Sequence, residues 1–83
     1  MSTIIFPIKC FGAFRKFGEN LNVEVPAGSS ADQIKQALIR ILGEQHKGLV
    51  EDSVLASDTA VLPGAYILKE PVDLCILPPV CGG

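Results

Sequence analysis

The sequence predicts an α+β fold in which one main helix packs across a mixed β-sheet. Three observations lead to this prediction. Two segments near the start alternate apolar and polar residues, one central segment has apolar residues at helical spacing, and an apolar strand-like segment, 72–77, comes near the end. At 83 residues the chain has room for one modest core. We therefore expect a single domain over 1–83, with 78–83 as a flexible tail.

The first two elements are predicted to form a hairpin. Every second residue of the segment 4–10 is apolar, namely Ile4, Phe6, Ile8 and Cys10. Pro7 indicates a position where the strand needs no backbone donor. Residues 11–19 contain Gly12 and Gly18 and predict a loop. Leu21, Val23 and Val25 then alternate with polar residues, which predicts the second strand.

The helix is marked at both ends. Ser30 stands three residues before Gln33, which is the spacing of a capping box, and Asp32 lies in the first turn, where the helix dipole favours negative charge. The residues predicted to form one buried stripe are Ile34, Ala37, Leu38, Ile41 and Leu42. Gly43 is a natural C-terminal stop.

The second half of the chain predicts short extended pieces. Residues 44–52 indicate a loop with room for one helical turn. Residues 54–56, 60–62 and 66–68 have the composition of short strands, and Pro63-Gly64 interrupts them. In the last strand, 72–77, Val72, Leu74 and Ile76 point to one face. A hairpin followed by one helix across a mixed sheet is the β-grasp arrangement of ubiquitin.

Composition excludes several classes of function. The net charge is −2 and the basic residues are scattered, which argues against nucleic-acid binding. Three cysteines without a Cys-x-x-Cys pair, together with one histidine, are too few for a zinc site, and we expect no bound metal or cofactor. No apolar run approaches the roughly 20 residues that span a bilayer. We expect no signal peptide and a cytoplasmic location.

The most informative segment is Pro79-Val80-Cys81-Gly82-Gly83. Glycine lacks a Cβ, so Gly82 and Gly83 suit a channel too narrow for side chains. The prolines before them favour an extended path. The segment therefore predicts a probe that enters a partner, with the Gly83 carboxylate as its reactive group. A frayed end without function is the alternative interpretation of such a tail.

Other nucleophiles and bases receive simpler interpretations. Cys81 is a competing nucleophile near the end, although a small tolerated side chain is the simpler interpretation. Cys10 is expected to be a small buried hydrophobe. His46 is expected to be a solvated loop residue, since no nucleophile or carboxylate is arranged around it.

An apolar partner surface is predicted on the outer face of the sheet, next to the tail. If Leu74 and Ile76 face the helix, alternation places Cys75 and Leu77 on the outer face, and Ile5 and Phe11 lie on the corresponding side of the first strand. Exposed apolar patches usually mark partner surfaces.

Two motifs carry a family resemblance: Phe11-Gly12-Ala13-Phe14-Arg15 after the first strand, and the ending from Leu77-Pro78 through Gly83. With them, the chain resembles the ubiquitin-like sulfur carriers of the MoaD/ThiS group, and most closely the molybdopterin synthase small subunits. The strand and helix plan extends the resemblance over essentially the whole chain. Cys81 departs from the family, which more often has Ser, Thr or Ala there.

The resemblance implies a sulfur-donating subunit. Gly83 would be adenylated by a ubiquitin-activating-type partner that uses ATP, and a persulfide donor would then convert it to a thiocarboxylate. The tail would enter the large synthase subunit, in a heterotetramer, and give sulfur to cyclic pyranopterin monophosphate in molybdenum cofactor biosynthesis. The catalytic side chains would lie in the large subunit.

Three alternatives stay open at this point. The chain could carry sulfur for another route, such as thiamine thiazole, cysteine or tRNA thiolation. It could be a ubiquitin-like protein modifier that forms isopeptide bonds with lysines. It could also be an interaction domain with an idle tail, in which case deletion of Gly82 and Gly83 leaves function intact.

Overall fold

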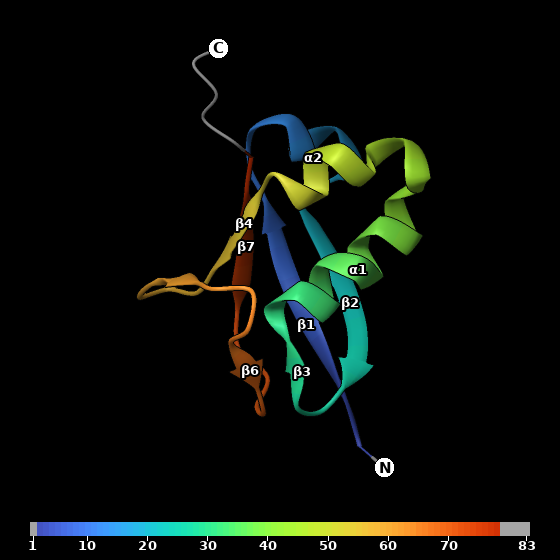
Figure 1. Ribbon diagram of the computed structural model, residues 1–83. Coiled ribbons are helices and arrows are strands. Elements are labelled where there is room, and N and C mark those ends of the chain that lie inside the picture. Colours follow the sequence, from blue (N-terminus) through green and yellow to red (C-terminus); the bar gives the residue numbers. More distant parts are fainter. Residues whose placement is uncertain (1, 79–83) are drawn as a thin grey trace.

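The structure is a computed structural model that describes residues 2–78. Its elements in chain order are β1 (Thr3–Cys10), η1 (Gly12–Phe17), β2 (Asn20–Pro26), β3 (Ser29–Ser30), α1 (Ala31–Leu42), η2 (Glu44–His46), α2 (Lys47–Glu51), β4 (Val54–Ala56), β5 (Val61–Leu62), β6 (Ile67–Leu68) and β7 (Leu74–Leu77). Five strands form a mixed sheet in the order β2-β1-β7-β4-β5, and β3 pairs with β6 in a separate two-stranded sheet (Figure 1). This architecture confirms the predicted α+β class and is compatible with a β-grasp.

The predicted hairpin is present, and its alternation defines the two faces of the sheet. β1 and β2 are antiparallel, and Phe6 lies opposite Val23, both fully buried. The intervening residues point to the other face, where Ile5 is 57% exposed. Residues 11–19 are not simply a loop, because η1 occupies most of the segment and buries Phe14 completely.

The helix begins where the sequence predicts it. The Ser30 hydroxyl accepts a hydrogen bond from the Gln33 backbone N–H at 3.2 Å, and the Gln33 side chain accepts one from the Ser30 N–H at 2.8 Å. Both bonds of the capping box are therefore made. Gly43 ends α1 at a φ of 109°, and its N–H donates to the Ile39 carbonyl.

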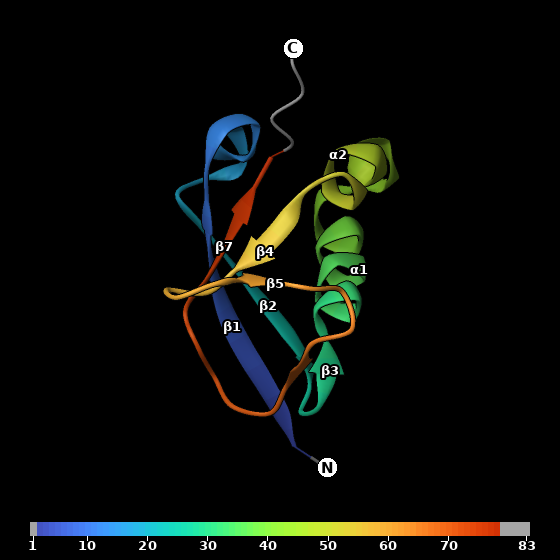
Figure 2. The ribbon, with the colours of Figure 1, turned by 60° about the vertical axis from the view of Figure 1, so that its left-hand side comes forward.

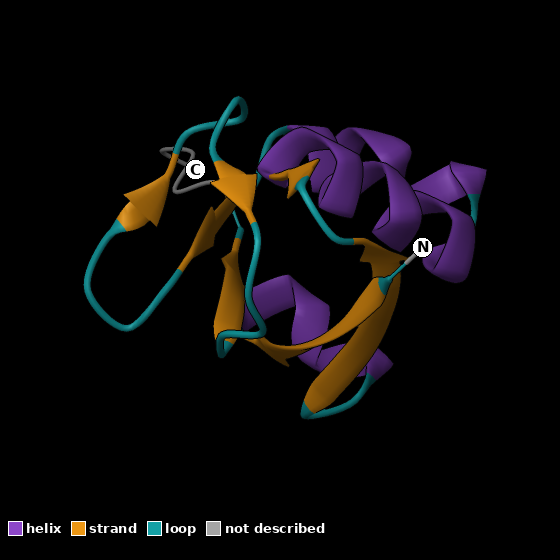
Figure 3. Ribbon diagram, turned by 90° about the horizontal axis from the view of Figure 1, so that it is seen from below, coloured by secondary structure: helices purple, strands orange, loops and turns teal. Residues whose placement is uncertain are grey.

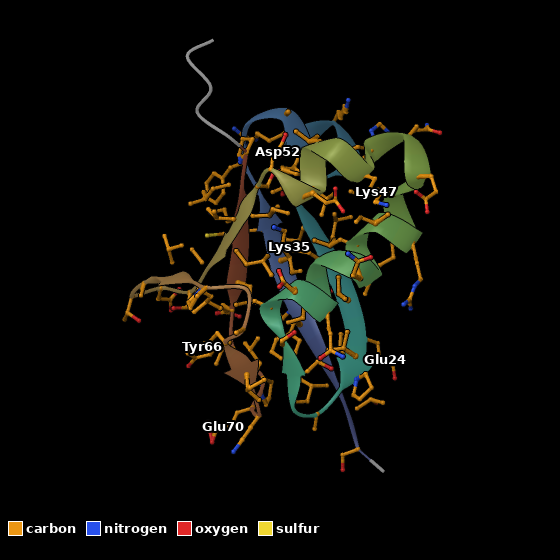
Figure 4. The ribbon with its side chains drawn as sticks, viewed as in Figure 1. Glu24, Lys35, Lys47, Asp52, Tyr66 and Glu70 are labelled. Atoms are coloured by element: carbon orange, nitrogen blue, oxygen red, sulfur yellow. The ribbon has the colours of Figure 1, made fainter. Side chains whose placement is uncertain are left out.

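The buried stripe of α1 differs from the prediction at one position. Ile41 is 52% exposed, whereas Ile39 is 4% exposed and belongs to the core. α2 packs against α1 near the C-terminal end of α1 (Figure 2). Lys35 donates from α1 to the carbonyl groups of Glu51 and Ser53, at 3.1 and 2.8 Å, and so holds the end of α2 (Figure 4). The side of α1 that bears Lys35 and Ile39 is therefore the covered side.

The later elements follow the predicted order, with three differences. The final strand begins at Leu74, and Val72 lies outside it and is 39% exposed. The extended piece at 67–68 is not in the main sheet but pairs with Ser29–Ser30. Residues 44–51 contain η2 and then α2, which is more helix than the single turn expected.

The core lies between one face of the main sheet and the two helices. Figure 3 shows α1 and α2 together beside the strands. Among the described residues, the largest side chains that are completely buried are Phe6, Phe14, Ile8, Ile34, Leu38 and Ile76. Within residues 2–78, no helix is both long and apolar enough to cross a membrane.

Candidate functional site

The last strand lies in the middle of the sheet. β7 runs parallel to β1, with Ile8 opposite Leu74 and Cys10 opposite Ile76. On its other side β7 is antiparallel to β4, with Val54 opposite Leu77. The chain therefore leaves the sheet between two paired strands, at the end where β1 passes into η1 (Figure 1). Pro79, Val80, Cys81, Gly82 and Gly83, predicted to enter a partner, lie outside the described residues.

Three of the four predicted surface residues lie together at this exit. Cys75 and Leu77 are half-buried on the face of β7 that points away from the helices, and Phe11 is half-buried directly after β1. Ile5 does not join them. It lies six residues before Phe11 along an extended strand, which corresponds to about 20 Å, and it pairs with Glu24 on β2.

Two further apolar residues extend this surface. Val54 is 41% exposed and lies opposite Leu77, and Val61 is 57% exposed and lies opposite Ala56, which in turn lies opposite Cys75. Directly paired residues of antiparallel strands point to the same face. Sequence reasoning missed Val54 and Val61 because the places of β4 and β5 in the sheet depend on strand order, which the pattern of apolar residues does not specify. We call Val54, Val61, Cys75, Leu77 and Phe11 the exit surface.

A hollow of about 500 Å³ lies beside the exit surface. Phe11 and Cys75 line it, together with Lys9, Asp58 and Asp73. The Lys9 ammonium lies 5.4 Å from the centroid of the Phe11 ring, within the range of a cation–π contact. The hollow therefore offers one cation, two carboxylates and a thiol around an aromatic ring.

The described cysteines have different surroundings. Cys10 is 2% exposed on the core face, as predicted, and burial raises the pKa of its thiol. A raised pKa disfavours the nucleophilic thiolate. Cys75 is half-buried and lines the hollow. Neither is in a disulfide.

His46 is half-buried in a short helix and is not the solvated loop residue expected from the sequence. It ends η2, and its ring meets the Phe17 ring edge-on, with centroids 4.8 Å apart. Its role in the described structure is thus packing between η1 and η2. Among residues 2–78, no cluster of three or more His, Cys, Asp and Glu side chains could hold a metal ion.

None of the protein-family models matches the chain, and none of the curated proteins matches it. Evidence for function therefore comes from the residues of this chain and their geometry.

Proposed function

We propose that the chain is a ubiquitin-like sulfur carrier with a β-grasp fold, and that it is the small subunit of a molybdopterin synthase. The observation that carries this proposal is the place of β7. The last strand lies at the centre of the sheet and is paired on both sides. The residues that follow it are Pro78-Pro79-Val80-Cys81-Gly82-Gly83. The Gly-Gly sequence at 82–83 thus follows the central strand of the sheet by only a few residues.

The chemistry of a carboxylate makes a partner necessary. The Gly83 carboxylate is inert until ATP converts it to an acyl-adenylate with release of pyrophosphate. Hydrosulfide then displaces AMP and leaves a thiocarboxylate. With a persulfide donor, the first product is an acyl disulfide, which a second thiol cleaves while being oxidised to a disulfide. The partner supplies orientation and exclusion of water, because two glycines have no side chains with which to do so.

Sulfur transfer then returns the carrier to its starting state. The thiocarboxylate sulfur attacks an electrophilic carbon of cyclic pyranopterin monophosphate. A carbon–sulfur bond forms as a carbon–oxygen bond at that carbon breaks, its oxygen leaving as water or on the phosphate, and the product is a thioester. Water cleaves the thioester, so the sulfur stays on the pterin and the Gly83 carboxylate is regenerated. In this proposal, the side chains that catalyse these steps belong to the large subunit.

The exit surface supports a partner that covers this end of the sheet. Val61 and Val54 are 57% and 41% exposed there, and Leu77 and Phe11 are only half-buried. A large subunit that takes in the tail would meet these residues first. Burial of apolar surface stabilises such an interface by about 25 cal/mol per Å².

Charging the protein tests the proposal. The chain is incubated with ATP, sulfide and an activating enzyme that adenylates sulfur carriers, and its intact mass is measured. We expect a gain equal to the replacement of one oxygen by sulfur, abolished by deletion of Gly83. No gain, with the enzyme shown to charge a known carrier, would contradict sulfur transfer of any kind.

A second step identifies the pathway. The charged carrier is mixed with a large synthase subunit and cyclic pyranopterin monophosphate, and we expect loss of the thiocarboxylate and formation of molybdopterin. Charging without transfer to the pterin would favour another sulfur route, such as thiazole or tRNA thiolation. Conjugates of higher mass that resist reducing agents would instead indicate a protein modifier.

A further inference from the structure

Gly12 and Pro78 lie against each other at the exit of the chain. A Cβ built on Gly12 would lie 2.6 Å from the Pro78 Cγ and 3.4 Å from its Cδ. Carbon atoms in contact lie about 3.5–4.0 Å apart. The proline ring therefore occupies the space that any side chain at residue 12 would need.

The backbone of Gly12 adds a second requirement. Its φ is +56°, in the left-handed region that favours glycine. Gly28 has a φ of +87°, but no atom lies within 4 Å of the place that a Cβ would take there. The two glycines thus share a backbone requirement, and of the two only Gly12 has a close neighbour.

Both partners in this contact are held by well-packed elements. The register of β1 and β7 pairs Ile8 with Leu74 and Cys10 with Ile76, so two more residues along each strand bring Gly12 opposite Pro78. On the β1 side, Phe14 is fully buried, and its N–H donates to the Phe11 carbonyl at 3.0 Å.

The β7 side is held as far as the residue before Pro78, because Leu77 pairs with Val54. Proline has no N–H to donate, so the β1–β7 ladder cannot continue through residue 78. At this position, the contact between Gly12 and Pro78 therefore replaces the backbone pairing that joins β1 and β7.

We propose that Gly12 and Pro78 form a seat that fixes where the chain leaves the sheet, and that Gly12 is thereby a positioning residue for the Gly83 carboxylate. The inference rests on the proposed function. Gly83 is five residues beyond Pro78 in the sequence, a reach of at most about 18 Å. Fixing the chain at Pro78 limits the volume that the Gly83 carboxylate samples. This raises the effective concentration of the carboxylate at a partner's active site.

The expected effect is moderate. The seat fixes the chain five residues before Gly83. If loss of the seat moves the last fixed point back by about three residues, this length grows from five to eight, and effective concentration falls about twofold by the −3/2 power of length. If the chain also leaves Pro78 in a different direction, the effective concentration of the Gly83 carboxylate falls further. We expect the KM of the activating enzyme for the carrier to rise about 3- to 10-fold, with kcat little changed, because the bound tail occupies the same place.

Four variants isolate the seat. Asparagine tolerates a positive φ, so the main effect of Gly12→Asn is a clash between its side chain and the Pro78 ring. Gly28→Asn is the control, because it places the same residue at a positive φ where no atom lies within 4 Å of the added Cβ. Pro78→Ala removes the ring, and the double variant combines both changes. We expect Gly12→Asn and Pro78→Ala each to raise KM, the double variant to raise it no further, and Gly28→Asn to leave it unchanged.

The inference would be overturned if the double variant raised KM by the product of the two single increases, because the effects of independent sites on KM multiply. An equal rise for Gly28→Asn would also overturn it. NMR of the full chain provides a readout independent of activity, since the seat predicts an NOE between the Gly12 Hα and the Pro78 ring protons. If the wild-type chain is not charged at all, the proposed function and the positioning role fail together, and the NOE still decides whether the seat exists.

Discussion

Truncation of Ile39 should destabilise the protein far more than the same truncation of Ile41. Both residues are in α1, and both changes to alanine remove three carbon atoms. Ile39 is 4% exposed and Ile41 is 52% exposed. The pair therefore tests which side of α1 faces the core, the point where the sequence pattern and the structure differ.

The magnitudes follow from burial. At about 0.8 kcal/mol for each buried CH₂ group, three carbons at Ile39 contribute about 2.4 kcal/mol, and an unfilled cavity brings the cost to about 3 kcal/mol. At Ile41 about half of the transfer term applies, without a cavity, and the better helix propensity of alanine offsets about 0.4 kcal/mol. We expect less than about 1 kcal/mol there.

Urea unfolding followed by circular dichroism measures both values. A domain of 83 residues has a total stability of about 4–12 kcal/mol, so Ile39→Ala is expected to remain folded. If Ile39→Ala does not fold, the milder substitutions Ile39→Val and Ile41→Val give the same comparison. Free energies of unfolding that agree within about 0.5 kcal/mol, or a larger loss at Ile41, would refute the packing of α1.

Three other predictions follow from the described contacts. Ser30→Ala removes one bond of the capping box and should cost about 1 kcal/mol in urea unfolding; no loss would mean that the cap contributes nothing. Lys35→Met removes the donor at the end of α2 and should cost about 1 kcal/mol, with faster hydrogen exchange at 47–53; unchanged exchange would contradict this role. In the folded protein, peptide mapping should find a thiol reagent on Cys75 well before Cys10, and equal rates would contradict the burial of Cys10. Burial raises the pKa of Cys10, so as the pH rises its thiol ionises in the unfolded chain before it ionises in the folded protein. Stability should therefore fall as the pH rises above 9.0, the ordinary pKa of a cysteine. Cys10→Val should remove this fall in stability.

The sequence was sufficient for elements that local patterns define. Alternation at Ile4, Phe6 and Ile8 identified the inward face of β1, and the spacing of Ser30 and Gln33 located the start of α1. In each case the signal comes from neighbours within a few residues. Such signals need no knowledge of what packs against the element.

Three of the misses depend on distant parts of the chain. α1 has isoleucine at both 39 and 41, and tertiary packing decides that Ile39 is the buried one. Ser29–Ser30 has no strand-like composition. It forms a strand only through its pairing with β6, which is distant in the sequence. Val54 joins the exit surface only because β4 lies next to β7.

The candidate site shows the same division. Phe11, Cys75 and Leu77 were predicted from alternation and lie together, whereas Ile5 lies at the other end of β1. Gly12 and Pro78 stood in two separate motifs, and their contact depends on the parallel register of β1 and β7. Sequence spacing alone does not specify that register.

Top-down mass spectrometry of the protein isolated from its native source tests the central claim most directly. A sulfur carrier of this kind is expected to end at Gly83, with a fraction of molecules in which one oxygen of the terminal carboxylate is replaced by sulfur. A chain that continues past Gly83, or Gly83 joined to a lysine through an isopeptide bond, would contradict it.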